Sequence, residues 1–134
     1  MEKILFKNAT LLDCTGAEPK EKAWALVENG LIGAVGTGKT PASKNAEVVD
    51  CRGGWLLPGL IDAHIHASLY SNDITDLHRK FHTAEGYFLA AEVLKDTLIQ
   101  GFTTVRDAAG IDAGFRRARE QGLITAPRMQ VCGR

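Results

Sequence analysis

The chain has 134 residues, with 16 basic and 16 acidic side chains and a formal net charge of zero. Hydrophobic residues make up 45% of the chain and charged residues 24%, which is the balance of a folded globular protein rather than a disordered one. The length excludes a complete barrel of eight strands and eight helices, which needs about 250 residues. The neutral charge argues against a general binder of nucleic acid or anionic membranes, because both require a basic face.

The sequence contains few features that indicate targeting or redox chemistry. Residues 1–7 hold no apolar stretch of the length that a signal peptide needs, and no run approaches the roughly 18 apolar residues of a membrane span. The cysteines, Cys14, Cys51 and Cys132, are odd in number and far apart, so they predict neither a disulfide framework nor a CxxC metal pair. We expect reduced thiols that serve as packing residues in a cytoplasmic protein.

Residues 1–57 are predicted to form an all-β segment. Asn29-Gly30 lies between two apolar runs, and this arrangement predicts a hairpin because a type I′ turn needs positive φ at both central residues. A glycine pair, Gly53-Gly54, breaks the chain near the end of the segment. The strand candidates are Ile4–Phe6, Thr10–Leu12, Ala23–Glu28, Leu31–Val35 and Glu47–Asp50.

Residues 58–134 are predicted to alternate strands with helices. The spacing of apolar residues from Tyr87 to Leu98 is that of one helix face, and Gly101 stands where a C-terminal cap belongs. Asp112 can cap a second, shorter helix. This alternation is typical of βα units around a parallel sheet. The strand candidates are Leu60–His66, Phe102–Val105 and Arg128–Cys132.

Three polar side chains, Asp62, His64 and His66, alternate along the first of these strands. Because every second side chain of a strand points to the same face, we expect all three to line one face. Two neutral imidazoles one pleat apart can bind a divalent ion such as Zn²⁺, which usually takes three or four protein ligands. Asp62 could orient those imidazoles. The alternative is two unrelated histidines, one of them satisfied in the core.

The residues around this strand resemble the amidohydrolase superfamily of metal-dependent hydrolases. Leu57–His66 is similar to the first barrel strand of that family, and three further stretches match it, all in the family's order. Thr-Thr-Val-Arg-Asp is typical of the imidazolonepropionase-like and prolidase-like branch. The further stretches are Gly30–Gly36, similar to the family's N-terminal β segment, Gly101–Asp107, similar to its second barrel strand, and Leu123–Arg128, similar to the approach to its third.

The resemblance implies an α/β fold and an activity. Residues 1–57 would be part of a small β-sandwich, and residues 58–134 would supply the first three strands of a (β/α)₈ TIM barrel. His64 and His66 would bind Zn²⁺ or another divalent metal in a mono- or binuclear site, while the remaining ligands and the general base lie beyond residue 134. The implied reaction is hydrolysis of a C–N bond in a small amide, cyclic amide or dipeptide by metal-activated water. On this interpretation the chain is an N-terminal fragment, inactive alone.

Two polar residues, Arg106 and Asp107, close the second predicted strand at the end where barrel active sites lie. They could contact substrate or orient the histidines, and the alternative is a surface ion pair or a loop cap. Ala67–Thr83 is long for a βα loop, and such loops often line a substrate pocket. Its His78 and His82 have helical spacing but lack a supporting acidic motif, so we expect them to be solvated.

Two other functions stay open. One is a non-catalytic chain that acts only by association, because three barrel strands leave an unpaired edge and an uncovered apolar face. The other is nucleotide binding, since Gly33–Thr40 fits G-x-x-x-x-G-K-[ST], in which Lys39 contacts phosphates and Thr40 contacts Mg²⁺. Pro41 leaves little room for the helix that this motif requires. The partners we expect are a small-molecule substrate and, as an option, further copies of the chain, but no nucleic acid or membrane.

Overall fold

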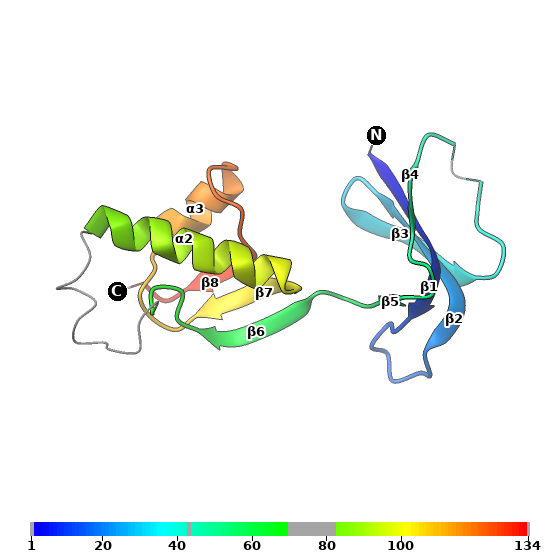
Figure 1. The fold of residues 1–134 in the computed structure, drawn as a ribbon, viewed down its shortest axis with the longest axis horizontal. Helices are drawn as coiled ribbons and strands as arrows, with labels where there is room; N and C mark the ends of the chain where they lie inside the picture. The colour runs from blue at the N-terminus through cyan, green and yellow to red at the C-terminus, as the bar shows by residue number, and fades with distance from the viewer. Residues whose placement is uncertain (1, 43, 70–82, 134) are drawn as a thin grey trace. The chain divides into compact units, whose positions relative to one another are not determined.

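The computed structural model describes residues 2–42, 44–69 and 83–133. The chain divides into two compact units, Met1–Pro58 and Gly59–Arg134, which appear at opposite ends of the colour scale in Figure 1. The first unit contains strands alone among its described residues, and the second combines strands with helices. The mixed α/β fold predicted from the sequence is therefore confirmed.

The first unit is built on one sheet whose central strand is β1. In the order β3-β2-β1-β4, β2 is antiparallel to both of its neighbours, while β4 and then β5 run parallel to β1 along its other edge. Leu5, Ala9 and Leu11 of β1 are buried together with Ala23 and Ala25 of β2. The strands are β1 (Lys3–Leu11), β2 (Lys20–Glu28), β3 (Leu31–Thr37), β4 (Glu47–Asp50) and β5 (Trp55–Leu56).

The structure confirms one turn predicted for this unit and changes the bounds of one predicted pair of strands. Asn29 and Gly30 form the predicted turn between β2 and β3, with φ of 52° and 77°. The two apolar stretches expected on either side of Asn8 are one continuous strand instead. Asn8 has φ of 54°, and the pairing of β1 with β2 shifts register between Phe6 and Ala9. A bulge therefore interrupts the pairing of this strand without ending it.

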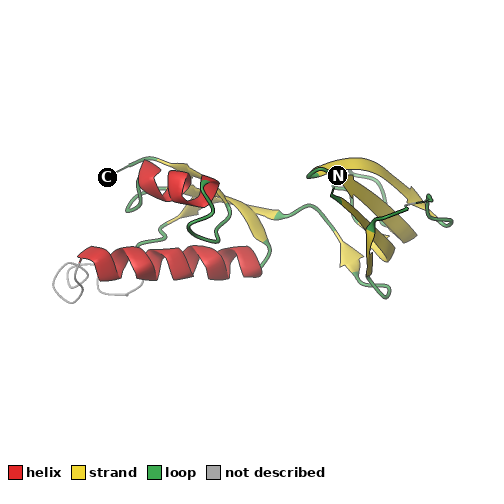
Figure 2. Ribbon diagram, turned by 90° about the horizontal axis from the view of Figure 1, so that it is seen from above, coloured by secondary structure: helices red, strands yellow, loops and turns green. Residues whose placement is uncertain are grey.

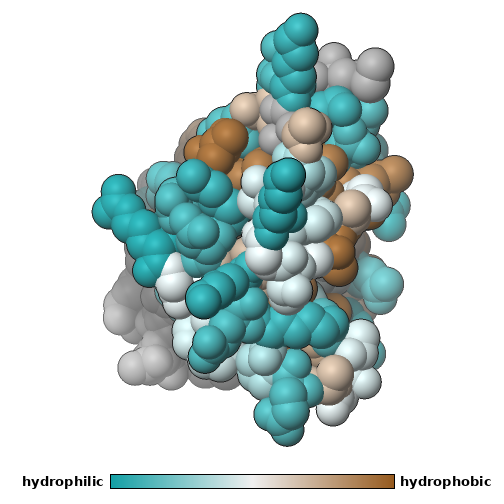
Figure 3. Space-filling view, turned by 90° about the vertical axis from the view of Figure 1, so that its right-hand side faces the viewer, coloured by the Kyte–Doolittle hydropathy of each residue, from teal (hydrophilic) through white to brown (hydrophobic). Residues whose placement is uncertain are grey.

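Large apolar side chains reach the surface of the first unit. Leu31 and Ile32 are more than 70% exposed, and Trp55 is 63% exposed. Hydrophobic atoms lie among hydrophilic ones on the face seen in Figure 3. Cys14 is exposed as well, as is Cys132 in the second unit, so the expectation of packing thiols is wrong for these two residues.

The second unit is a three-stranded parallel sheet in the order β6-β7-β8. One described helix through Leu94 and the other through Phe115 pack against the cluster that contains Val105 and Met129 of the sheet, so both lie on the same side of it. Figures 1 and 2 show the helices and strands of this unit. The described strands form an open sheet and no closed barrel. The elements are β6 (Leu60–Ile65), α2 (Thr83–Ile99), β7 (Phe102–Asp107), α3 (Ala113–Glu120) and β8 (Arg128–Val131).

The core of the second unit lies between the sheet and its helices. Leu94 of α2 is fully buried in a cluster that includes Val105 of β7 and Met129 of β8. Gly101, with φ of 98°, follows α2 as predicted, and the carboxylate of Asp112 caps α3 by accepting a hydrogen bond from the Gly114 N–H at 2.8 Å. No helix in the described part of the chain is long and apolar enough to cross a membrane. The buried cluster consists of Ala67, Ala90, Leu94, Val105, Ile111, Ala126 and Met129.

Candidate functional site

Two histidines meet at the C-terminal end of β6. The Nε2 atoms of His64 and His66 are 3.3 Å apart, and the ring centroids are 5.2 Å apart with an angle of 71° between the planes. Both side chains flank Ile65, which packs against the core, so by strand alternation they lie on the sheet face opposite the helices. The structure therefore brings together the two predicted ligands with one ring nitrogen of each converging.

A backbone carbonyl faces one nitrogen of the His66 ring. His66 Nδ1 lies 3.3 Å from the carbonyl oxygen of Ala109. Because a carbonyl only accepts hydrogen bonds, this contact favours the tautomer with the proton on Nδ1, which leaves a lone pair on Nε2. That lone pair then lies on the atom that faces His64, since the two Nε2 atoms are 3.3 Å apart. A ring nitrogen with a free lone pair is the atom that binds a metal ion.

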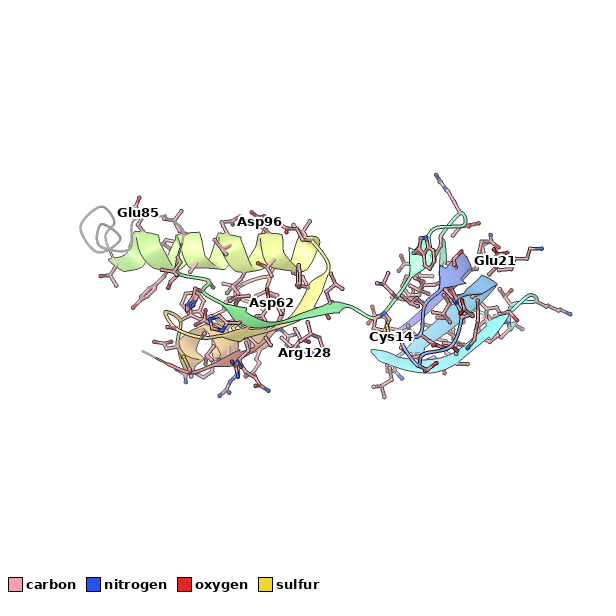
Figure 4. The ribbon with its side chains drawn as sticks, turned by 90° about the horizontal axis from the view of Figure 1, so that it is seen from below. Cys14, Glu21, Asp62, Glu85, Asp96 and Arg128 are labelled. Carbon is pink, nitrogen blue, oxygen red and sulfur yellow. The ribbon has the colours of Figure 1, made fainter. Side chains whose placement is uncertain are left out.

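Asp62 does not share the face of the two histidines, which corrects the expectation from strict alternation. Asp62 is in register with Val105, whereas Ile65, three positions later, is in register with the residue only two positions after Val105. Val105 is buried against the helices, and residues in register point the same way, so Asp62 lies on the helix side. Figure 4 shows it between β6 and α2, with Arg128 on the opposite side of the sheet.

The carboxylate of Asp62 nevertheless supports the strand that carries the histidines. Its Oδ1 accepts a hydrogen bond from the backbone N–H of His64 at 3.0 Å. This bond lies within the stretch where β6 carries its extra residue. Asp62 thus holds the backbone at His64. A direct effect of Asp62 on the imidazole rings stays a prediction.

Arg106 lies on the same face as the histidine pair. It follows the buried Val105 in β7 and is in register with Gln130 of β8. Its side chain is exposed, and its Nε donates a hydrogen bond to the carbonyl oxygen of Ala63 at 2.8 Å. The guanidinium is therefore anchored to β6 beside the histidines. A contact between Arg106 and a substrate stays a prediction.

Asp107 has an entirely different environment from Arg106. Its side chain has 0% exposure, and Oδ2 accepts the backbone N–H of Ala67 at 2.9 Å. Oδ1 lies 3.4 Å from the backbone nitrogen of Ile111. These contacts are those of a loop cap, one of the alternatives considered above, and they join the loop after β6 to the loop after β7. Asp107 does not reach the exposed face on which a substrate would lie.

The loop after β7 is the part of the site that sequence reasoning did not single out. Gly110 has φ of 117°, and a Cβ added there would overlap the side chain of Ser68, so only glycine fits this close approach. The Ala109 carbonyl belongs to the same turn. A glycine three residues after the strand was the available signal, but a backbone carbonyl leaves no trace in the side-chain pattern.

Within the described residues the histidine pair has no further metal-binding group beside it. No cluster of three or more histidine, cysteine, aspartate or glutamate side chains there could hold a metal ion. His78 and His82 lie outside the described residues, as does most of the long connection before α2. Two converging imidazole nitrogens nevertheless fit the chemistry of Zn²⁺, as two of the three or four ligands that it takes.

The phosphate-binding pattern at Gly33–Thr40 lacks the structure that this motif requires. Its first half lies inside β3, which ends at Thr37. The described residues that follow, 38–42 and 44–46, form bends and a turn but no helix. A phosphate loop places its glycines before the N-terminus of a helix. The described geometry therefore gives nucleotide binding no support.

The second unit, together with the end of the first, matches a known protein family. The model of the Amidohydrolase family matches residues 55–133, which include the histidine pair, the Arg106-Asp107 pair and the loop after β7. The chain belongs to the Amidohydrolase family.

Individual amidohydrolases resemble the chain over almost its whole length. An imidazolonepropionase of Acidiphilium cryptum (strain JF-5) is 33% identical over 133 residues, covering 91% of this chain and 30% of that protein. The crystal structure of an amidohydrolase is 35% identical, with a TM-score of 0.88 over 98% of this chain and 32% of that one. A prolidase complexed with N-methylphosphonate-L-proline is 28% identical, with a TM-score of 0.87 and the same coverage.

These matches confirm the resemblance to the imidazolonepropionase-like and prolidase-like branch. The chain spans about a third of the length of each of these relatives.

Proposed function

We propose that this chain supplies the first half of the metal site of an amidohydrolase that hydrolyses a C–N bond in a small amide, cyclic amide or dipeptide. The observation that carries the proposal is the convergence of the Nε2 atoms of His64 and His66, 3.3 Å apart, inside the region that matches the family. The names of its relatives, imidazolonepropionase and prolidase, support this substrate class.

His64 and His66 would hold Zn²⁺ or another divalent cation. Since zinc sites use at least three protein ligands, the remaining ligands come from residues outside the described part of the chain. The bound cation would polarise the scissile carbonyl. It would also lower the pKa of a bound water molecule, so that hydroxide is available at neutral pH. The residues of this chain have a separate task, which is to hold the two imidazole Nε2 atoms close together.

The arrangement of the second unit supports its assignment as the first three strands of a (β/α)₈ barrel. Its strands are parallel and follow one another in chain order, both described helices cover one face, and the histidine pair lies on the other face at the carboxyl end of β6. Barrel enzymes keep their active sites at that end of the strands. We assign the first unit, Met1–Pro58, to a small β-sandwich that accompanies the barrel.

Binding of Zn²⁺ to the purified chain tests this proposal. We expect weak but measurable binding in competition with a chromogenic chelator, because two ligands are present. His64→Ala and His66→Ala should each weaken it by roughly tenfold or more, since loss of a ligand costs at least as much as loss of a group that merely orients one.

His78→Ala serves as the matched control, because that histidine is expected to be solvated. Equal zinc affinity in the wild-type chain and in the two site variants would contradict the assignment of His64 and His66 as ligands. A loss of affinity in the His78 variant alone would move the metal site to the long connection before α2.

A further inference from the structure

The turn after β7 encloses the end of β6 through backbone contacts. The N–H of Ala108 donates to the carbonyl oxygen of Ile65 at 2.8 Å, and the carbonyl oxygen of Ala109 meets the Nδ1 of His66 at 3.3 Å. One residue further along, Gly110 approaches Ser68 so closely that a Cβ would not fit. Three successive residues of this turn therefore lie against three residues at the end of β6 and just after it, which are Ile65, His66 and Ser68.

One buried carboxylate ties both partners of the His66–Ala109 contact together. Oδ2 of Asp107 accepts the N–H of Ala67, the residue that follows His66, at 2.9 Å. Oδ1 faces the N–H of Ile111, two residues after Ala109, at 3.4 Å. Because Asp107 is fully buried, water cannot replace either contact. The carboxylate thus fixes the backbone on the ring side and on the carbonyl side at once.

We propose that Asp107 is a positioning residue that keeps His66 in its Nδ1–H tautomer, with Nε2 directed at His64, by holding the Ala109 carbonyl against the ring. This inference deepens the proposed function, on which it rests for its consequence for metal binding.

The tautomer matters because only an unprotonated ring nitrogen binds a metal ion. A His66 ring that carries its proton on Nε2 offers no lone pair beside His64 and must change tautomer before it can bind. The apparent affinity for the cation is then the intrinsic affinity multiplied by the fraction of molecules in the competent tautomer. Asp107 touches no ligand, so its effect on the cation passes entirely through His66.

Asp107→Asn is the variant that tests the proposal. Asparagine keeps the size of the side chain, but its NH₂ group faces one of the two backbone N–H groups that the carboxylate accepts. Asp112→Asn is the matched control, because Asp112 makes the same kind of bond to a backbone N–H in the same turn but caps α3. Asparagine caps helices as well as aspartate does, so this control should retain its fold.

Two readouts separate positioning from general stability. Nitrogen-15 NMR of the imidazole rings in metal-free protein reports which ring nitrogen of His66 carries the proton, and chelator competition reports the dissociation constant for Zn²⁺. We expect the Nδ1–H form in the wild-type chain and in Asp112→Asn. In Asp107→Asn we expect a mixture of tautomers and a zinc affinity lower by about tenfold to a hundredfold.

The outcomes distinguish this inference from the proposed function. A shifted tautomer in Asp107→Asn supports the inference even where the wild-type chain fails to bind Zn²⁺, a failure that would count against the proposed function alone. An unchanged tautomer and an unchanged zinc affinity in a folded Asp107→Asn variant would overturn it. Should that variant not fold, the wild-type ring decides, because a proton on Nε2 of His66 overturns the proposal and a proton on Nδ1 supports it.

Discussion

The carboxylate of Asp13 is held by three donors where the chain leaves β1. The Nζ of Lys20 donates to Oδ2 at 2.7 Å, and the backbone N–H and the hydroxyl of Thr15 donate to Oδ1 at 3.1 and 2.7 Å. These hydrogen bonds, of which that from Lys20 is the strongest influence, lower the pKa of Asp13 well below its usual range. The stability that they add is present above the unfolded pKa and is lost as the pH falls through the folded pKa.

Removing the lysine should reverse this shift. In Lys20→Ala we expect the pKa of Asp13 to rise toward its ordinary value, because the bond that lowers it most is gone while those from Thr15 remain. An NMR titration of the Asp13 carboxyl group measures this directly. Lys7→Ala, which removes a lysine that pairs with Asp50 instead, should leave Asp13 unchanged. An unshifted Asp13 in Lys20→Ala would show that the two residues do not interact in solution.

Single side chains at the site were predictable where their neighbours in sequence decide their position. His64 and His66 flank a core residue of one strand, so alternation alone places them together. Asp62 escaped that argument because β6 carries an extra residue, and a bulge depends on the pairing with β7 rather than on the sequence of β6. The part played by Ala109 is a property of its backbone, which no side-chain pattern records.

Among the elements, helix α2 packs on the rest of its unit through few buried residues. Leu94 has 0% exposure and Ala90 1%, whereas Phe88 is 75% exposed and Ile99 is 72% exposed on the same helix. The helix therefore packs through small and medium-sized residues, and much of its large apolar surface contributes little to the core. The free energy that docks α2 on the sheet is concentrated in a few contacts around Leu94.

Leu94→Ala should consequently destabilise the second unit by about 2–5 kcal/mol, because it removes buried methyl groups and leaves a cavity. Phe88→Ala, on the same helix, should change the free energy of unfolding by no more than about 0.5 kcal/mol. Denaturant unfolding followed by circular dichroism compares the two variants. Equal effects would mean that α2 does not pack on the sheet through Leu94.

Elements with a local signal at their ends were the ones that could be predicted. The β2–β3 turn follows from Asn29-Gly30, the end of α2 from Gly101, and the start of α3 from Asp112, each of which acts within a few residues. Strand β5 has two residues and exists because it pairs with the end of β1. Such a strand has no periodicity of its own, so its sequence could not reveal it.

At the scale of the whole molecule, both units expose apolar side chains beside strand edges that no other described strand pairs with. β6 and β8 are the outer strands of the three-stranded sheet, and β3 is an outer strand of the other sheet. Unpaired edges with apolar side chains promote pairing with another chain. The side chains in question include Leu31 and Ile32 of β3, Leu60 and Ile61 of β6, and Leu123 after α3, which are between 45% and 73% exposed.

We therefore expect the 134-residue chain to self-associate at micromolar concentrations, which light scattering coupled to size-exclusion chromatography would reveal. Ile61→Lys, which places a charge on the edge strand β6, should increase the monomer fraction. Leu123→Lys adds the same charge at a similarly exposed position outside the strands and should have a smaller effect. A monodisperse monomer of the wild-type chain would contradict the expectation that it acts through association.

The contacts that position the histidine pair also set an order of assembly. They lie within residues 62–67, within residues 106–111 or between these two stretches, so none of them needs β8 or anything after it. During synthesis on the ribosome, all the groups involved are available once Ile111 has emerged. On the proposed function, the two imidazoles would therefore already be close together before β8 is made.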